Sequence, residues 1–119
     1  MLGKILIVDD DPDMRKLLKD FFEFSGYEVY CLKSAGEALL KIEAECVDIV
    51  ITDYSMPDMD GLELTRIIRQ TMPSLPIIGI SANCHERKFI AAGANHFVSK
   101  PFGLRQLLDV IKTYLRAVQ

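Results

Sequence analysis

What this sequence lacks excludes several classes of protein. No apolar run is long enough to cross a membrane. The net charge of −3 gives no positive field that would attract nucleic acid or an anionic membrane. The chain also has no linker, no low-complexity tract and no fixed-period repeat. We therefore expect a globular domain that binds neither a membrane nor nucleic acid directly.

Cysteine is scarce, and its spacing forms no recognisable framework. The three cysteines, Cys31, Cys46 and Cys84, make up an odd set with no CxxC pair and no zinc-ligand spacing. We interpret them as free thiols. Free thiols are typical of a reducing compartment, which predicts a cytoplasmic location.

The composition that is present suits one ordinary domain. Of the 119 residues, 50% are hydrophobic and 26% are charged. A chain of this length can bury one substantial core. We expect residues 1–119 to form a single domain.

Short apolar runs alternate with segments of helical period along the whole chain. Asp11 before Pro12 and the capping box of Ser34 and Glu37 predict two helix starts. The last helical segment carries apolar residues from Leu104 to Val118. Strands are predicted at 4–9, 27–32, 48–53, 77–81 and 96–99.

Five successive strand–helix units predict an α/β fold. Such units form a parallel sheet covered by helices on both faces, and right-handed crossovers make it an open, doubly wound sheet. In sheets of this kind ligands bind at the carboxyl ends of the strands. The residues that follow the strands are therefore the candidates for a functional site.

Acidic and polar residues follow four of the predicted strands. The first strand ends in Asp9 and Asp10, the third in Asp53 and the fourth in Ser81, and the fifth ends just before Lys100. Three carboxylates brought together would repel one another, and a hard divalent cation with oxygen ligands, such as Mg²⁺, relieves this repulsion. Three acids, a divalent cation and one ammonium sum to a nearly neutral site.

A neutralised acidic site can admit a phosphoryl group. Asp53 is then a candidate nucleophile, because a carboxylate can form an aspartyl phosphate. The cation and Lys100 would stabilise charge on the phosphoryl oxygens, and Ser81 could donate a hydrogen bond to one of them. We predict that Asp10 and Asp53 ligate the cation directly and that Asp9 orients a bound water.

Simpler interpretations exist for each residue alone. Asp53 could be a turn residue, the run 9–11 a solvated helix start and Lys100 a surface lysine. A calcium loop beginning at Asp9 is excluded, because Met14 occupies its obligatory glycine position. A flavin site is disfavoured, since the acidic loop DDDPD would repel a phosphate. A haloacid-dehalogenase-like phosphatase needs a second aspartate where Ser55 stands.

Four stretches carry a resemblance to a known family. They are ILIVDDD at 5–11, DIVITDYSMPDMDG at 48–61, ISA at 80–82 and SKPF at 99–102. In this order, and over essentially the whole length, the chain resembles the receiver domain of two-component response regulators. The resemblance implies a flavodoxin-like five-stranded sheet of order 2-1-3-4-5 with five helices.

The resemblance also implies a specific chemistry. Asp53 would accept a phosphoryl group from a histidine kinase or a histidine phosphotransfer protein. Asp9 and Asp10 would form the acidic pair, and Ser55 would supply a backbone carbonyl to Mg²⁺ or Mn²⁺. The domain would catalyse only its own phosphorylation and dephosphorylation. An unidentified effector protein would act downstream, and phosphorylation could drive dimer formation.

A second group of residues would carry the conformational switch. By resemblance, Ser81 and Lys100 move toward the phosphoryl group, and Phe97 turns into space beside Ala82. The Lys100–Pro101 bond is expected to be cis, which would aim the lysine inward.

The chain departs from the family pattern in several places. The segment from Ser81 to Gly93 is about one helical turn shorter than usual, which shortens the fourth helix. Gly103 stands where a Ser, Thr or Asp often caps the last helix. No output domain follows that helix, so a stand-alone regulator and a receiver taken from a larger protein both remain open. A receiver-like domain that binds a partner without phosphorylation is the competing hypothesis, followed by a phosphatase.

Overall fold

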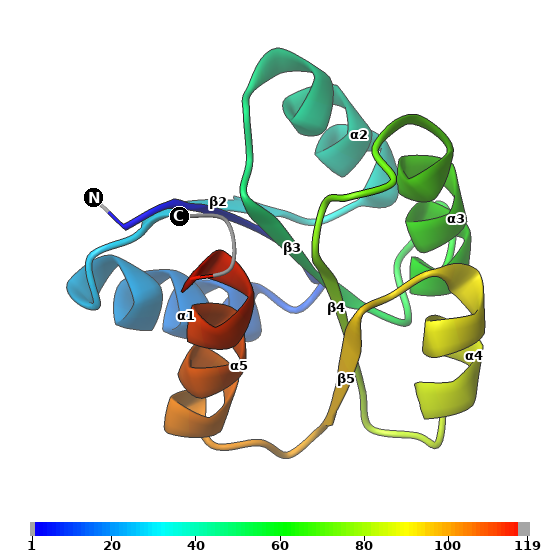
Figure 1. Cartoon of the computed structure of the whole chain (residues 1–119). Helices are drawn as coiled ribbons and strands as arrows, with labels where there is room; N and C mark the ends of the chain where they lie inside the picture. Colours follow the sequence, from blue (N-terminus) through cyan, green and yellow to red (C-terminus); the bar gives the residue numbers. More distant parts are fainter. Residues whose placement is uncertain (1, 117–119) are drawn as a thin grey trace.

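The computed structural model describes residues 2–116, in which five strands alternate with five helices (Figure 1). The elements are β1 (Lys4–Val8), α1 (Pro12–Phe24), β2 (Glu28–Leu32), α2 (Ala35–Ala44), β3 (Ile49–Asp53), α3 (Gly61–Thr71), β4 (Ile77–Ser81), α4 (Glu86–Ala92), β5 (His96–Ser99) and α5 (Leu104–Arg116). Every predicted strand is present, and three of them are one residue shorter than predicted. Val118, expected to continue the last apolar stripe, lies outside the described residues.

The strands form one parallel sheet in the order β2-β1-β3-β4-β5, as predicted. β1 and β3 lie side by side near the middle, with Val8 opposite Thr52 at their carboxyl ends. Asp9 still donates its N–H to the Leu32 carbonyl at 3.0 Å before the chain leaves the sheet. The residues after β1 and β3 are therefore neighbours in space.

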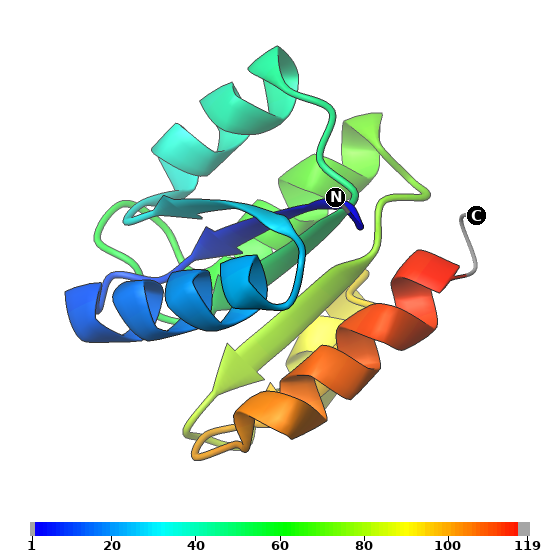
Figure 2. The same cartoon turned by 90° about the vertical axis from the view of Figure 1, so that its left-hand side faces the viewer.

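Helices cover both faces of the sheet. α1 and α5 pack on one face, and α2, α3 and α4 pack on the other (Figure 1, Figure 2). Alternate residues of the central strands serve the two layers: Ile5 and Ile7 face α1 and α5, whereas Leu6 and Val8 face the other helices. β1, β3 and β4 are buried along nearly their whole length, as the continuous apolar runs predict.

The helix starts follow from the local sequence. The Asp11 side chain accepts the Asp13 N–H at 3.0 Å, and Ser34 accepts the Glu37 N–H at 3.2 Å. Both predicted caps are therefore confirmed. In α5, the Gly103 carbonyl accepts the Leu107 N–H at 3.2 Å, so Gly103 occupies the cap position there.

Gly79 is unusual for a buried strand, and its neighbour explains it. A Cβ at this position would lie 2.4 Å from the ring of Phe89, which is itself fully buried. The missing side chain lets α4 bring Phe89 against β4. The short fourth helix, of seven residues, is anchored in this way.

The helices and the cysteines agree with what the composition predicts. Within residues 2–116, no helix has the length and hydropathy to cross a membrane. Cys31, Cys46 and Cys84 are all free, as predicted. Burial raises the pKa of the Cys31 thiol to about 11, so this thiol resists forming the reactive thiolate.

Candidate functional site

Three carboxylates meet where β1 and β3 end. Asp9 is fully buried and Asp53 is 8% exposed, whereas Asp10 is exposed at the start of the β1–α1 loop. One carboxylate oxygen from each residue lies within 4.8 Å of the others. The fold therefore assembles the acidic cluster that the strand-end pattern predicts.

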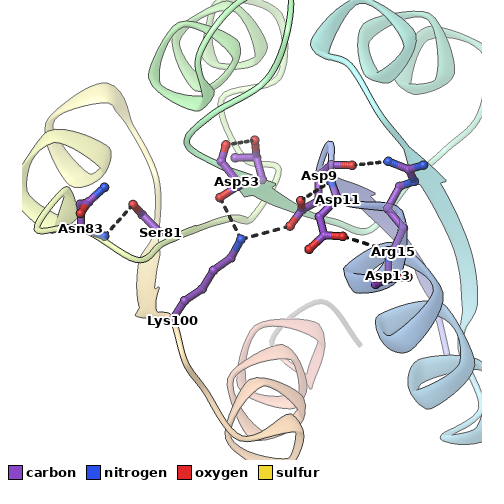
Figure 3. A network of polar contacts seen from close by, with 9 residues as sticks. Asp9, Asp11, Asp13, Arg15, Asp53, Ser81, Asn83 and Lys100 are labelled. Atoms are coloured by element: carbon purple, nitrogen blue, oxygen red, sulfur yellow. Dashed lines mark hydrogen bonds and ion pairs between the residues drawn. The ribbon is translucent and has the colours of Figure 1, made fainter.

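Lys100 brings an ammonium group close to these acids. Its Nζ lies 3.3 Å from Asp9 Oδ2 and 3.2 Å from Asp53 Oδ1, so it bridges the two buried carboxylates (Figure 3). The Lys100–Pro101 peptide is cis, as the resemblance implied. The Lys100 N–H also donates to the Ser81 carbonyl at 2.9 Å, which ties the end of β5 to the end of β4.

The site keeps an excess of negative charge. Three carboxylates and one ammonium leave two negative charges. Burial, and then the nearby Asp9 carboxylate, raise the pKa of Asp53 above its usual value, although Lys100 opposes them. Burial disfavours the Lys100 ammonium, but Asp9 and Asp53 outweigh it, so the pKa of Lys100 is raised.

The donor set fits a hard divalent cation. Carboxylate oxygens are the ligands that Mg²⁺ and Mn²⁺ prefer. Asp9 is already engaged on both oxygens, since Oδ1 accepts the Asp11 N–H at 2.9 Å and Oδ2 accepts from Lys100. Arg15 adds a bond to the Asp9 carbonyl at 2.8 Å, which fixes the loop (Figure 3). The exposed Asp10 is thus the freest of the three ligands, whereas Asp53 also contacts the Lys100 ammonium.

The loop after Asp53 is held close to the end of its strand. The Gly61 N–H donates to the Tyr54 carbonyl at 2.7 Å, and a Cβ on Gly61 would lie 2.2 Å from the Asp53 carbonyl oxygen. Only glycine permits this approach. Ser55 is exposed within the loop. Its proposed carbonyl ligand role stays a prediction.

The two later acids of this loop have structural tasks. Asp60 caps α3 by accepting the Glu63 N–H at 2.9 Å. The Asp58 carboxylate accepts the N–H groups of Gly36 at 2.8 Å and Ala35 at 3.1 Å, at the start of α2. These N–H groups hold the pKa of Asp58 below its usual range. Asp58 therefore ties the β3–α3 loop to another helix, a role that the sequence did not reveal.

The switch candidates lie on the neighbouring strands. Ser81 is 4% exposed at the end of β4, and its Oγ accepts the Asn83 N–H at 3.1 Å. Phe97 is half-buried on β5, and its ring centroid lies 5.8 Å from that of Phe89. The exposed Ala82 follows Ser81 directly.

Sequence reasoning missed one residue beside this site. His85 Nδ1 lies 2.8 Å from Ser81 Oγ, and the His85 ring stacks on Tyr54 with centroids 3.7 Å apart. The sequence placed His85 only at the start of the short fourth helix. Its position four residues after Ser81, across a tight loop, was the one available signal.

The strand order and the acidic edge together define a class of protein: a doubly wound α/β domain whose functional site lies at the carboxyl ends of its central strands. The family model described as the response regulator receiver domain matches residues 5–112. The chain therefore belongs to the response regulator receiver domain family, in accord with its resemblance to it.

Individual relatives agree with this assignment. The chain is 44% identical to part of the sensor protein EvgS of Escherichia coli K12, over 93% of this chain and 9% of EvgS. It is 38% identical to the response regulator MprA of Mycolicibacterium vanbaalenii, over 95% of this chain and 50% of MprA. A solved CheY-like receiver domain protein from Methanospirillum hungatei is 36% identical, with a TM-score of 0.92 over 98% of this chain and 96% of that one. The chain thus spans half or less of the two curated relatives.

Proposed function

We propose that this domain accepts a phosphoryl group on Asp53 and passes the signal on through a change of conformation. One observation carries the proposal: the buried Asp53 carboxylate lies in one cluster with Asp9, Asp10 and the Lys100 ammonium. The donor is the phosphohistidine of a histidine kinase or of a phosphotransfer protein. Residues 1–119 act as one receiver domain, located in the cytoplasm.

The proposed transfer uses groups that the fold already positions. An Asp53 carboxylate oxygen attacks the phosphorus, the P–N bond of the phosphohistidine breaks, and the donor imidazole keeps the electron pair and takes a proton from solvent. The Lys100 ammonium, which contacts Asp53 before the reaction, stabilises the negative charge of the transferred oxygens. Water attack on the aspartyl phosphate later reverses the modification, so the domain catalyses only reactions of its own carboxylate.

A divalent cation is part of the proposal. Asp10, Asp53 and the Ser55 carbonyl would hold Mg²⁺ or Mn²⁺, and Asp9 would act through a water. The cation supplies positive charge toward the phosphoryl oxygens and lowers the repulsion among the acids. The engagement of both Asp9 oxygens by other donors supports the indirect role of that residue.

The proposed output is a shift between two packings of the face formed by β4, α4, β5 and α5. Ser81 and Lys100 close on the phosphoryl group, and Phe97 turns toward the space beside Ala82. An effector protein, or a second copy of the domain, then recognises the altered face. In the phosphorylated packing, the Ser81 hydroxyl must be free of other acceptors so that it can donate to the phosphoryl group.

Phosphorylation can be tested by intact mass after incubation with Mg²⁺ and acetyl phosphate. We expect a phosphate adduct on the wild type and on Asp58→Asn, which alters another acid of the same loop, but not on Asp53→Asn. An adduct that survives in Asp53→Asn would overturn the proposal. A rapid quench, or binding of beryllofluoride with Mg²⁺, covers the case of a short-lived adduct. Absence of both in the wild type would favour a partner-binding domain that is not phosphorylated.

A further inference from the structure

The Ser81 hydroxyl is engaged away from the phosphoryl site. Its Oγ accepts the Asn83 N–H at 3.1 Å and lies 2.8 Å from His85 Nδ1. Figure 3 shows the hydroxyl directed toward Asn83 and away from Asp53 and Lys100. A hydroxyl has one proton to donate. Because the Asn83 contact uses an acceptor lone pair of Ser81, that proton is free to be donated to His85.

The His85 ring is held firmly in this position. It lies nearly parallel to the Tyr54 ring, with an interplanar angle of 8° and centroids 3.7 Å apart. Tyr54 directly follows Asp53 in the chain and also makes an edge contact with the buried Phe89. The His85 N–H donates to the Asn83 carbonyl at 2.9 Å, and its carbonyl accepts the Phe89 N–H at 2.9 Å. Both the ring and the backbone of His85 are thus fixed.

We propose that His85 is a positioning residue that holds the Ser81 hydroxyl in its resting orientation by accepting its proton at Nδ1. In this arrangement His85 carries its own proton on Nε2. The inference rests on the proposed function, in which Ser81 donates to a phosphoryl oxygen on Asp53. Since Ser81 has a single proton, phosphorylation must exchange the Ser81–His85 hydrogen bond for a Ser81–phosphoryl hydrogen bond. His85 therefore stabilises the unphosphorylated conformation.

The connection between β4 and α4 is short and places His85 beside Ser81. Only residues 82–85 separate the end of β4 from the start of α4. Asn83 and His85 both bond to Ser81 within this segment.

Two substitutions separate the hydrogen bond from the stacking. His85→Phe keeps an aromatic ring against Tyr54 but has no acceptor for Ser81. His85→Asn keeps an acceptor near the position of Nδ1 but loses most of the ring. A residue that acts only by stacking would tolerate the first change better than the second, and a positioning residue would show the reverse.

The test is the affinity for beryllofluoride in the presence of Mg²⁺. It is measured for the wild type, for His85→Phe, His85→Asn and Ser81→Ala, and for the double variant that combines Ser81→Ala with His85→Phe. We expect His85→Phe to bind about three- to tenfold more tightly, as the loss of one net hydrogen bond from the resting state predicts. His85→Asn should stay within about twofold of the wild type, since its acceptor is retained.

The double variant is the control for the hydrogen bond itself. In the Ser81→Ala background there is no hydroxyl to hold, so adding His85→Phe should leave the affinity unchanged. An unchanged or weaker affinity in His85→Phe alone, or the same gain in both backgrounds, would overturn the inference.

A second measurement does not depend on phosphorylation. The chain has 2 histidines, so long-range proton–nitrogen NMR spectra can resolve both rings. In the unliganded protein, we expect His85 with Nε2 protonated and Nδ1 as an acceptor whose nitrogen shift changes in Ser81→Ala. A protonated Nδ1, or an Nδ1 shift that ignores Ser81→Ala, would contradict the inference. A wild type that shows the expected tautomer but never binds beryllofluoride would instead refute the proposed function.

Discussion

Strand β4 has a partly buried cation beside each of its ends, and the surroundings of the two differ. At the carboxyl end, Lys100 faces the carboxylates of Asp9 and Asp53, with Asp10 close by. At the amino end, Arg69 meets no carboxylate among the contacts of the described residues and donates instead to neutral oxygens. The first cluster carries an excess of negative charge, whereas in the second the guanidinium uses four of its five N–H donors.

Arg69 closes the amino-terminal end of the sheet. Its guanidinium makes four hydrogen bonds of 2.6–3.1 Å. The acceptors are the carbonyl oxygens of Met72, Leu75 and Gly93 and the side-chain oxygen of Asn95. The same Asn95 oxygen accepts the Ile77 N–H at 2.8 Å, at the first residue of β4. Burial lowers the pKa of Arg69, but no acidic partner is needed, since the carbonyl dipoles satisfy the charge.

The difference between the two clusters indicates that Arg69 serves stability and Lys100 serves function. The hydrogen bonds around Arg69 link loop carbonyl oxygens and Asn95, and they contribute to folding. The cluster around Lys100 keeps surplus carboxylates whose repulsion opposes folding and which a cation and a phosphoryl group can relieve. The account therefore predicts that changing Lys100 alters the chemistry and changing Arg69 alters the stability.

The largest effect is expected for Lys100→Met, which keeps the aliphatic stem and removes the ammonium. The initial rate of phosphorylation by acetyl phosphate should fall about a hundredfold, because one stabilising donor to the transferred oxygens is lost. The rate is measured by quenched intact mass over a time course. Lys112→Met, in the second half of α5, is the control and should keep the wild-type rate. A wild-type rate of phosphorylation in Lys100→Met would contradict the functional role of Lys100.

Arg69→Ala should show the opposite profile. The free energy of unfolding should fall by about 2–4 kcal/mol, since four oxygens, three of them in partly buried contacts, lose a charged donor. Urea denaturation measures this loss. The folded fraction of the variant should still accept a phosphoryl group from acetyl phosphate. Arg66→Ala is the matched control on the same helix, because the contact of Arg66 within residues 2–116 is an exposed pair with Glu63. The control should change stability by no more than about 0.5 kcal/mol. Equal losses in the two variants would contradict the structural role of Arg69.

The smallest effect is expected for the stability of Asp53→Asn. Because burial and Asp9 raise the pKa of Asp53 in the folded state, keeping it ionised opposes folding at neutral pH. The variant should therefore melt at a higher temperature than the wild type when divalent cations are absent. The gain should shrink as the pH falls toward and then below the ordinary carboxyl pKa of about 3.9, because Asp53 is then protonated in both the folded and the unfolded protein. A gain in melting temperature that grows as the pH falls would contradict a raised pKa of Asp53 in the folded state.

Much of the fold could be predicted because its signals are local. The βα units are indicated by apolar runs and apolar helical stripes, and the first two helices also by the caps Asp11 and Ser34. The acidic site could be predicted for the same reason, since Asp9 and Asp53 directly follow buried runs and parallel strands end at one edge. The helix-start role of Asp60 is also local, because its side chain accepts the N–H of Glu63 three residues later.

The remaining contacts depend on how loops close, which no local pattern encodes. Asp58 bonds to a helix start more than twenty residues away. Arg69 and Asn95 meet only after α3 and β5 have packed. The contact of His85 with Ser81 depends on the length of the β4–α4 loop and on a ring stacked from another strand end. In each case the partner is set by tertiary geometry rather than by a neighbour in sequence.

The central claim is that Asp53 is the residue that is modified. Borohydride reduces an aspartyl phosphate to homoserine, so treatment after phosphorylation with Mg²⁺ and acetyl phosphate, followed by peptide mapping, locates the phosphoryl group directly. The account predicts homoserine at position 53 and at no other aspartate. Homoserine at Asp9, Asp10 or Asp58, with position 53 unchanged, would contradict it.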